Sequence, residues 1–160
     1  HRLSGRAAGP FVAVDVGALP DTLFESELFG SVRGAFTDAK TDRAGRFEEA
    51  QKGTLFLDEI GNLGPAQQAR LLTALQQRSA TRLGSNKAVA VNARVICATN
   101  APLHELVAQK QFRADLLYRI NTIELELPPL RDRPEDIVPL AEHFLALYRK
   151  QYARPVSQLS

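Results

Sequence analysis

The stretch Thr54-Leu55-Phe56-Leu57-Asp58-Glu59 decides the fold class of this chain. It begins as a continuous apolar run, which is typical of a strand buried on both faces within a parallel sheet that helices cover. The run ends in two adjacent carboxylates, Asp58 and Glu59. Because open α/β sheets bind ligands at the carboxyl ends of their strands, the stretch predicts an α/β protein with its chemistry beside these two residues.

Other strands and helices alternate along the chain on both sides of this stretch. Two further runs are apolar or β-branched, and a third alternates apolar and polar residues as a strand near an edge does. These predicted strands are 11–16, 93–98 and 120–127. Helical periodicity is present at 22–29, 65–78, 112–118 and about 137–151. Such alternation predicts an α/β fold with a mainly parallel sheet.

Size and composition fit one folded domain. The chain has 160 residues, a formal net charge of +2, 44% hydrophobic residues and 24% charged residues. No apolar run approaches the ~18 residues of a membrane span, and the near-balanced charge gives no electrostatic case for nucleic-acid binding by this segment. The single cysteine, Cys97, excludes an internal disulfide and suits a reducing compartment, so we expect a cytoplasmic protein. Cys97 lies inside an apolar run and is expected to be an inert core thiol.

Asp58 and Glu59 have the chemistry of a nucleotide hydrolase. Asp58 would hold Mg²⁺, usually through water, and Glu59 would polarise the attacking water. A hard cation needs oxygen ligands, and a reacting water needs a carboxylate within hydrogen-bond reach. The alternative is that the pair only caps the turn at Ile60-Gly61-Asn62. This motif alone leaves both interpretations open.

Two weaker signals come later in the chain. Thr99 and Asn100 follow the strand predicted at 93–98 and would lie beside the same water or phosphate, although this motif alone favours a simple turn at the strand exit. Arg113 and Arg119 are six residues apart, which is about 240° around a helix at ~100° per residue, so one helix face cannot present both. They could still reach one phosphate if the helix ends near Tyr118. The alternative is two solvated or ion-paired arginines.

A glycine-flanked insert at 30–40 carries Phe36 among small and polar residues. An exposed aromatic side chain on a mobile loop is a candidate for contact with a partner. The alternative is that Phe36 fills the core and fixes the loop.

Seven short stretches, taken in order, resemble the sigma-54 interaction domain, the AAA+ ATPase module of bacterial enhancer-binding transcriptional activators. The likeness runs over essentially the whole chain, and the ordered set is far more specific than any one stretch. The stretches are 25–30 (ESELFG), 34–39 (GAFTDA), 45–50 (GRFEEA), 53–60 (GTLFLDEI), 98–100 (ATN), 112–119 (FRADLLYR) and 127–131 (LPPLR).

The resemblance implies an ATP site with Mg²⁺. Asp58 and Glu59 resemble the Walker B pair, in which Asp58 serves the Mg²⁺ and Glu59 activates water. Thr99 and Asn100 resemble sensor I, which reads the γ-phosphate, so Asp58 and Asn100 are the expected ATP contacts. Arg113 and Arg119 resemble arginine fingers, which reach the nucleotide of a neighbouring subunit and stabilise the transition state. The implied assembly is a ring.

The insert resembles the signature loop that touches sigma-54 RNA polymerase. Its residues are Gly34, Ala35, Phe36, Thr37, Asp38 and Ala39, with Phe36 and Thr37 as the contacts. Arg82 resembles a position in a second loop on the pore side. The implied mechanism is mechanical, since ATP hydrolysis in the ring would move both loops and convert a closed promoter complex to an open one. Contact with DNA would belong to a domain absent here, and no membrane is involved.

Three features depart from the family pattern. Asp38 stands where the family most often has Gly, which alters the flexibility and charge of the signature loop. Asp15 stands where the family has an Asn that hydrogen-bonds the Walker B glutamate as a switch, and an anion there would repel Glu59 or share a proton with it. No Gly-x-x-x-x-Gly-Lys-Ser/Thr string, the Walker A loop, occurs.

The expected fold is therefore an incomplete AAA+ P-loop NTPase-type three-layer parallel sheet. The first strand, which would lie between 93–98 and 120–127, is missing together with the Walker A loop. We expect residues 1–130 to form a partial AAA+ α/β subdomain and 131–160 to form a connector and the first helix of the helical lid. The chain is expected to be a fragment of a sigma-54-dependent regulator. The alternative is a sigma-factor interaction module that does not hydrolyse ATP; another kind of AAA+ machine is disfavoured by residues 34–39.

Overall fold

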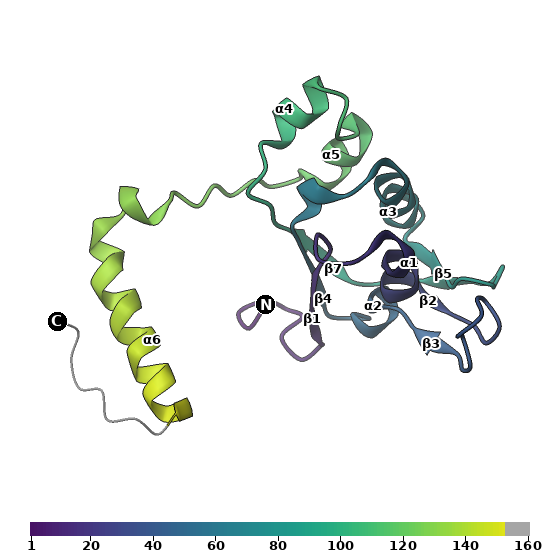
Figure 1. Cartoon of the computed structure of the whole chain (residues 1–160), viewed down its shortest axis with the longest axis horizontal. Helices are drawn as coiled ribbons and strands as arrows, with labels where there is room; N and C mark the ends of the chain where they lie inside the picture. The colour runs from purple at the N-terminus through teal and green to yellow at the C-terminus, as the bar shows by residue number, and fades with distance from the viewer. Residues whose placement is uncertain (153–160) are drawn as a thin grey trace. The chain divides into compact units, whose positions relative to one another are not determined.

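Three parallel strands form the central sheet (Figure 1) of the computed structural model, which describes residues 1–152. The chain divides into two units, His1–Thr122 and a second unit that begins at Ile123, and the sheet belongs to the first. The strand order is β1-β4-β7, so the strand that carries the two carboxylates lies in the middle. The strands are β1 (Phe11–Asp15), β4 (Thr54–Asp58) and β7 (Arg94–Cys97). The predicted parallel α/β sheet is confirmed.

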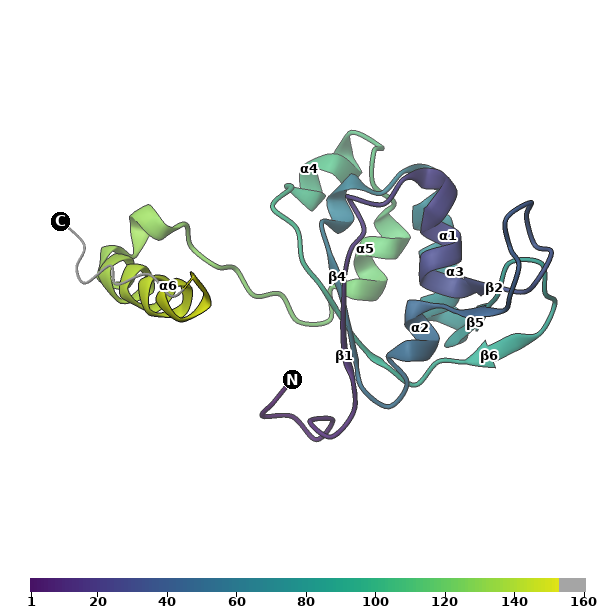
Figure 2. The same ribbon diagram turned by 60° about the horizontal axis from the view of Figure 1, so that its bottom comes forward.

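Helices of the first unit cover the sheet. They are α1 (Asp21–Phe29), α2 (Arg46–Glu49), α3 (Pro65–Gln77), α4 (Leu103–Ala108) and α5 (Ala114–Ile120). Figure 2 shows α1, α3 and α5 on the same side of β1 and β4. Phe24, Phe47, Leu55, Leu71 and Leu116 are fully buried in this layer. Burial of each such side chain stabilises the fold by about 1.5–3 kcal/mol relative to exposure.

Two short antiparallel hairpins extend from the same unit. One joins β2 (Gly30–Ser31) to β3 (Arg43–Ala44), and the other joins β5 (Ser79–Thr81) to β6 (Ala88–Ala90). A parallel bridge between Ser31 and Leu83 holds the two hairpins together. The connecting loops 32–42 and 82–87 therefore start from one shared base, and both views show them on the same side of the molecule.

The strand predicted at 120–127 is wrong. Helix α5 continues to Ile120, and no strand follows it. Ile123, Leu125 and Leu127 alternate with polar residues as an edge strand would, yet their side chains are exposed. A strand needs a hydrogen-bonded neighbour, and among the described residues no strand pairs with this segment in a sheet. Alternation predicted which side chains share a face, but it could not supply the neighbouring strand.

The second unit is short and mostly helical. Two single turns, η2 (Leu130–Asp132) and η3 (Pro134–Asp136), lead into α6 (Ile137–Tyr152), which confirms the predicted last helix. The proline-rich composition of 128–134 explains the short turns, because proline fixes the backbone and removes a hydrogen-bond donor. The boundary expected after residue 130 stays a prediction. Among residues 1–152, no helix is long and apolar enough to cross a membrane.

Candidate functional site

The carboxyl ends of the three strands meet at one edge of the sheet. Asp15 lies opposite Asp58 in the register of β1 and β4, and the Val16 N–H donates to the Asp58 carbonyl at 3.0 Å. On the other side, the Ala98 N–H donates to the Leu57 carbonyl at 2.8 Å. Asp15, the Asp58–Glu59 pair and the segment at Thr99 therefore lie side by side, as the sequence predicted from the strand ends.

Glu59 has an unusual backbone. Its φ of 58° and ψ of 39° place it in the left-handed region, which non-glycine residues seldom adopt. A Cβ on Gly17 would approach the Glu59 Cβ to 2.9 Å, so only glycine leaves room for Glu59 here. Such conformations cost of order 1–3 kcal/mol and are concentrated at functional sites. The turn at the end of β4 therefore fixes where the Glu59 carboxylate points.

The two oxygens of the Glu59 carboxylate differ. Oε1 accepts a long hydrogen bond of 3.4 Å from the Asn100 amide, while Oε2 is buried and makes no hydrogen bond among the described residues. Asn100 is thus the side chain that holds Glu59. Asp58 accepts a hydrogen bond of 3.0 Å from the Glu59 N–H, and Asp15 accepts one of 3.1 Å from the Ala18 N–H, closing its own turn. The repulsion expected between Asp15 and Glu59 stays a prediction.

The donor set at this edge suits a cation held mainly by a nucleotide. Within residues 1–152, no group of three or more His, Cys, Asp or Glu side chains could hold a metal ion by itself. Mg²⁺ commonly binds through one or two carboxylates together with phosphate and water oxygens. The Asp58 carboxylate fits that arrangement, and the free Oε2 of Glu59 fits a contact with water.

Arg113 and Arg119 lie at opposite ends of α5, and both have partners within the chain. The Arg113 guanidinium pairs with Asp115 at 2.7 Å and holds the pKa of that exposed carboxyl below its usual value. The Arg119 guanidinium donates to the Leu75 carbonyl at 2.8 Å. The expectation that one helix face cannot present both stays a prediction, since Arg113 precedes the first residue of α5. Either side chain has to leave its present partner before it can reach a phosphate elsewhere.

Loop 32–42 presents Phe36 to solvent, with 44% of the residue exposed. Two hydrogen bonds close the tip of the loop, from the Gly34 N–H to the Ala39 carbonyl at 2.8 Å and from the Ala39 N–H to the Phe36 carbonyl at 3.0 Å. Gly34 has a φ of 82°, which glycine adopts without strain. The Asp42 carboxylate accepts a hydrogen bond from the Arg33 N–H at 2.8 Å and so joins the two ends of the loop. The structure therefore favours an exposed Phe36 over one that fills the core.

Loop 82–87 is fastened to loop 32–42. The Val32 N–H donates to the Leu83 carbonyl at 3.0 Å, and a Cβ on Gly84 would lie only 2.8 Å from the Ala35 Cβ. Arg82 makes two hydrogen bonds to Glu48, at 2.7 and 2.6 Å, and it lies 4.0 Å from Asp42. The hydrogen bond from Arg82 lowers the pKa of the Glu48 carboxyl against the opposing effect of burial. The two loops thus have a common anchor on α2.

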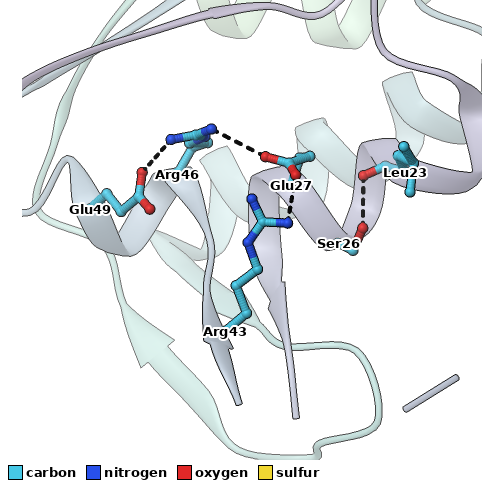
Figure 3. A network of polar contacts seen from close by, with 6 residues as sticks. All are labelled: Leu23, Ser26, Glu27, Arg43, Arg46 and Glu49. Carbon is cyan, nitrogen blue, oxygen red and sulfur yellow. Dashed lines mark hydrogen bonds and ion pairs between the residues drawn. The ribbon is translucent and has the colours of Figure 1, made fainter. Parts of the chain in front are cut away.

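A second ion-pair network holds the base of loop 32–42 (Figure 3). Glu27 on α1 pairs with Arg43 at 2.7 Å and with Arg46 at 3.2 Å, and Arg46 continues to Glu49 at 2.8 Å. The Glu27 side chain is only 17% exposed, so these pairs are partly shielded from solvent. The network joins α1, β3 and α2 where the loop returns to the body of the unit.

Comparison with known proteins identifies the family. The family model of the sigma-54 interaction domain matches residues 1–126. The chain belongs to the sigma-54 interaction domain family.

Its relatives are regulators of transcription. It is 55% identical over 148 residues to the sigma54-dependent transcriptional activator SfnR of Pseudomonas putida, covering 92% of this chain and 40% of SfnR. It is 51% identical over 160 residues to the Nif-specific regulatory protein of Herbaspirillum seropedicae, covering 100% of this chain and 30% of that protein. The chain therefore spans well under half the length of these relatives.

Solved structures agree with the fold. NtrX from Brucella abortus superposes with a TM-score of 0.90 at 32% identity, covering 100% of this chain and 36% of NtrX. A second NtrX crystal structure, a complex with ATP, superposes with a TM-score of 0.84 at 34% identity over 94% of this chain and 34% of NtrX. Hsp104 from S. cerevisiae, at 20% identity and a TM-score of 0.55 over 71% of this chain and 23% of Hsp104, shares the fold alone. The AAA+ fold expected from the resemblance is confirmed.

In this sigma-54 interaction domain, sequence reasoning missed two residues near the site. Gly17 gives Glu59 room, but a glycine after a strand is common and carries no distinct signal. Gln68 on α3 is 1% exposed and hydrogen-bonds the backbone before α5. Its helical position alone predicted a core-facing residue as readily as a surface one, and two of its three partners are more than 40 residues away in the chain.

Proposed function

We propose that this chain forms part of the ATP-hydrolysing module of a sigma-54-dependent transcription activator that works in the cytoplasm. The observation that carries the proposal is the family match over residues 1–126, combined with the meeting of Asp58, Glu59 and Asn100 at one sheet edge. The ATP complex of NtrX supports ATP as the nucleotide. Mg²⁺, sigma-54 RNA polymerase and a ring of subunits are further parts of the proposal.

Hydrolysis would rest on three side chains of one subunit. Mg²⁺, when bound with ATP, would neutralise the charge that develops on the transferred phosphoryl group. Asp58 would hold that ion through water. Glu59 would accept the proton of the attacking water at Oε2, the oxygen without a hydrogen bond among the described residues, while Asn100 keeps Oε1 fixed. Thr99 and Asn100 would also sense the γ-phosphate.

The neighbouring subunit would complete the site. Arg113 and Arg119 would reach the nucleotide across a ring interface and stabilise the charge of the transition state. Arg113 is exposed, and its ion-pair partner within residues 1–152 is Asp115 in the first turn of the following helix, at 2.7 Å. That pair is a surface contact of small energy, so exchange for a phosphate costs little.

The loop at 34–39 would transmit the movement that follows ATP hydrolysis to the polymerase. Phe36 and Thr37 would contact the sigma factor, and the connections through Leu83 and Arg82 would make both loops move together. Asp38 and Asp15, the two departures from the family pattern, would modify the flexibility of the loop and the environment of Glu59.

Glu59→Gln tests the enzymatic part in the longer protein that contains this chain. We expect ATP turnover to fall by about 10²- to 10⁴-fold, because the amide cannot accept the proton, while ATP binding is retained. Glu105→Gln is the matched control, since Glu105 is an exposed glutamate on α4, and it should leave turnover unchanged. Equal turnover of the wild type and Glu59→Gln would contradict the assignment.

Phe36→Ala tests the proposed contact between loop 34–39 and the sigma factor. It should abolish transcription activation with sigma-54 polymerase while ATP turnover stays within about twofold of wild type, because Phe36 lies outside the sheet edge. Leu23→Ala, which removes another exposed apolar side chain from α1, should leave activation intact. Unchanged activation by Phe36→Ala would refute the loop assignment.

The second candidate function is a sigma-factor interaction module without hydrolysis. The observation in its favour is Asp15, which brings a third carboxylate to the edge that holds Asp58 and Glu59. This candidate predicts no ATP turnover by the wild-type protein, but binding to the sigma factor that Phe36→Ala still abolishes.

A further inference from the structure

Gln68 is a buried amide whose polar atoms are all used. It lies in the first turns of α3 with 1% of the residue exposed. Its Nε2 donates to the Leu63 carbonyl at 2.7 Å and to the Gln111 carbonyl at 2.9 Å. Its Oε1 accepts from the Arg113 N–H at 2.9 Å. Because an unpaired buried polar atom is strongly unfavourable, these three bonds have to form or break together.

The three bonds join two segments that are far apart in the sequence. Leu63 ends the single turn η1 (Ile60–Asn62), which follows Glu59 directly. Gln111 and Arg113 are on either side of the buried Phe112 in the turn between α4 and α5. One side chain therefore connects the backbone after the Walker B carboxylate to the backbone of the residue that resembles an arginine finger.

Arg113 depends on this connection for its backbone position. It is the first residue before α5, and no described side chain caps that helix end. Its N–H donates to Gln68, and its carbonyl accepts from the Leu117 N–H inside α5 at 3.1 Å. The guanidinium itself is exposed and pairs with Asp115 in the first turn of α5.

We propose that Gln68 is a positioning residue that sets the start of α5, and hence the place from which Arg113 reaches the neighbouring subunit's ATP. The proposal rests on the proposed function, since it assumes that Arg113 acts across a ring interface. Gln68 also ties that position to the segment after Glu59 in the same subunit. In each subunit, Gln68 thereby links the segment after the subunit's own carboxylates to Arg113, which would act on the ATP of the neighbouring subunit.

The first test compares two neighbouring glutamines on α3. Gln68→Met keeps the volume of the side chain and removes all three hydrogen bonds. Gln67→Met is the matched control, because Gln67 is also buried and, among the described residues, its side chain hydrogen-bonds the Gly64 N–H and Asp21, neither of which belongs to α5. In the longer protein, we expect Gln68→Met to lower kcat by about tenfold or more with less than about threefold change in the KM for ATP, and Gln67→Met to change neither.

The second test uses mixed oligomers. Glu59→Gln subunits cannot hydrolyse ATP but present a normal Arg113, while Gln68→Met subunits keep normal carboxylates. Mixing the two should restore turnover above the sum of the separate proteins, and Arg113→Ala in place of Gln68→Met should behave in the same way. The proposal would be overturned if mixtures of Gln68→Met with Glu59→Gln stay inactive while mixtures of Arg113→Ala with Glu59→Gln recover ATP turnover. A wild-type protein without turnover would instead refute the proposed function.

A third variant covers the case in which Gln68→Met fails to fold, as thermal unfolding would show. Gln68→Glu loses the two donors but keeps an acceptor for the Arg113 N–H. We expect it to be less stable than wild type and yet to retain more turnover than any variant lacking that acceptor. Turnover that follows thermal stability alone across Gln68→Glu, Gln68→Met and Gln67→Met would overturn a positioning role.

Discussion

At the scale of single residues, the sequence predicted where the carboxylates lie better than how they are held. The adjacency of Asp58 and Glu59 after an apolar run was sufficient to predict carboxylates at the carboxyl end of a strand, and the register of β1 and β4 shows Asp58 there; their role in chemistry stays a prediction. The left-handed backbone of Glu59 could not be predicted, because it depends on the room that Gly17 leaves. Gln68 was missed for a similar reason, since all three of its partners are backbone groups brought together by folding.

Glu48→Gln should make the protein less stable above about pH 5 and have little effect at lower pH. The Arg82 hydrogen bond lowers the pKa of Glu48 in the folded state below the ordinary value of 4.5. A lowered folded-state pKa means that the carboxylate contributes stability above the unfolded-state pKa, and this is lost as the pH falls through the folded-state pKa. We expect a loss of about 1–2 kcal/mol at pH 7, measured by urea unfolding.

The Arg82 side of the same pair supplies the control. In an Arg82→Gln background, Glu48→Gln should have a smaller effect at pH 7, because the interaction is already gone. An equal effect of Glu48→Gln with and without Arg82 would show that the pair does not stabilise the fold.

Cys97 should be unreactive in the folded protein. Burial raises the pKa of its thiol to about 12, so about one thiol in 10⁴ is ionised at pH 8, against about a quarter for a free cysteine. Alkylation by iodoacetamide, followed by mass spectrometry of the peptide that contains Cys97, should be at least about 10²-fold slower in buffer than in urea. Equal rates would place Cys97 outside the sheet.

At the scale of elements, length decided what the sequence could predict. The strands and helices with clear periodicity, such as β4 and α3, were predicted within a few residues of their ends. The strands β2, β3, β5 and β6 have two or three residues each, which is too short for a period, and they are defined by their pairing with one another. The segment 120–127 had the right period but no neighbouring strand, which a local pattern cannot reveal.

Glu27→Gln should loosen the base of loop 32–42. Glu27 pairs with Arg43 and Arg46 and is 17% exposed, so its loss takes a partly shielded carboxylate from Arg43 and leaves Arg46 with Glu49 (Figure 3). We expect about 1–2 kcal/mol of lost stability and faster hydrogen exchange at 43–45. Glu25→Gln, on the same helix, removes an exposed pair with Arg70 at 3.8 Å and should cost less than about 0.5 kcal/mol. Equal losses of stability in Glu27→Gln and Glu25→Gln would contradict the view that Glu27 holds the base of the loop.

At the scale of the whole molecule, the ordered set of short stretches was the decisive signal. Each was ambiguous alone, whereas together they resembled one family, and the match over residues 1–126 confirms that family. The likeness to NtrX, with a TM-score of 0.90, confirms the fold in the same way. The action of the assembly is a proposal: ATP hydrolysis at the sheet edge would move loops 32–42 and 82–87 against sigma-54 RNA polymerase.

Formation of heparin-resistant open promoter complexes tests that proposal most directly. The longer protein that contains this chain is mixed with sigma-54 RNA polymerase and promoter DNA, with ATP or a non-hydrolysable analogue. We predict open complexes with the wild type and ATP, and none with the analogue or with Glu59→Gln. Open complexes formed by Glu59→Gln at the wild-type rate would contradict a role for hydrolysis at this site.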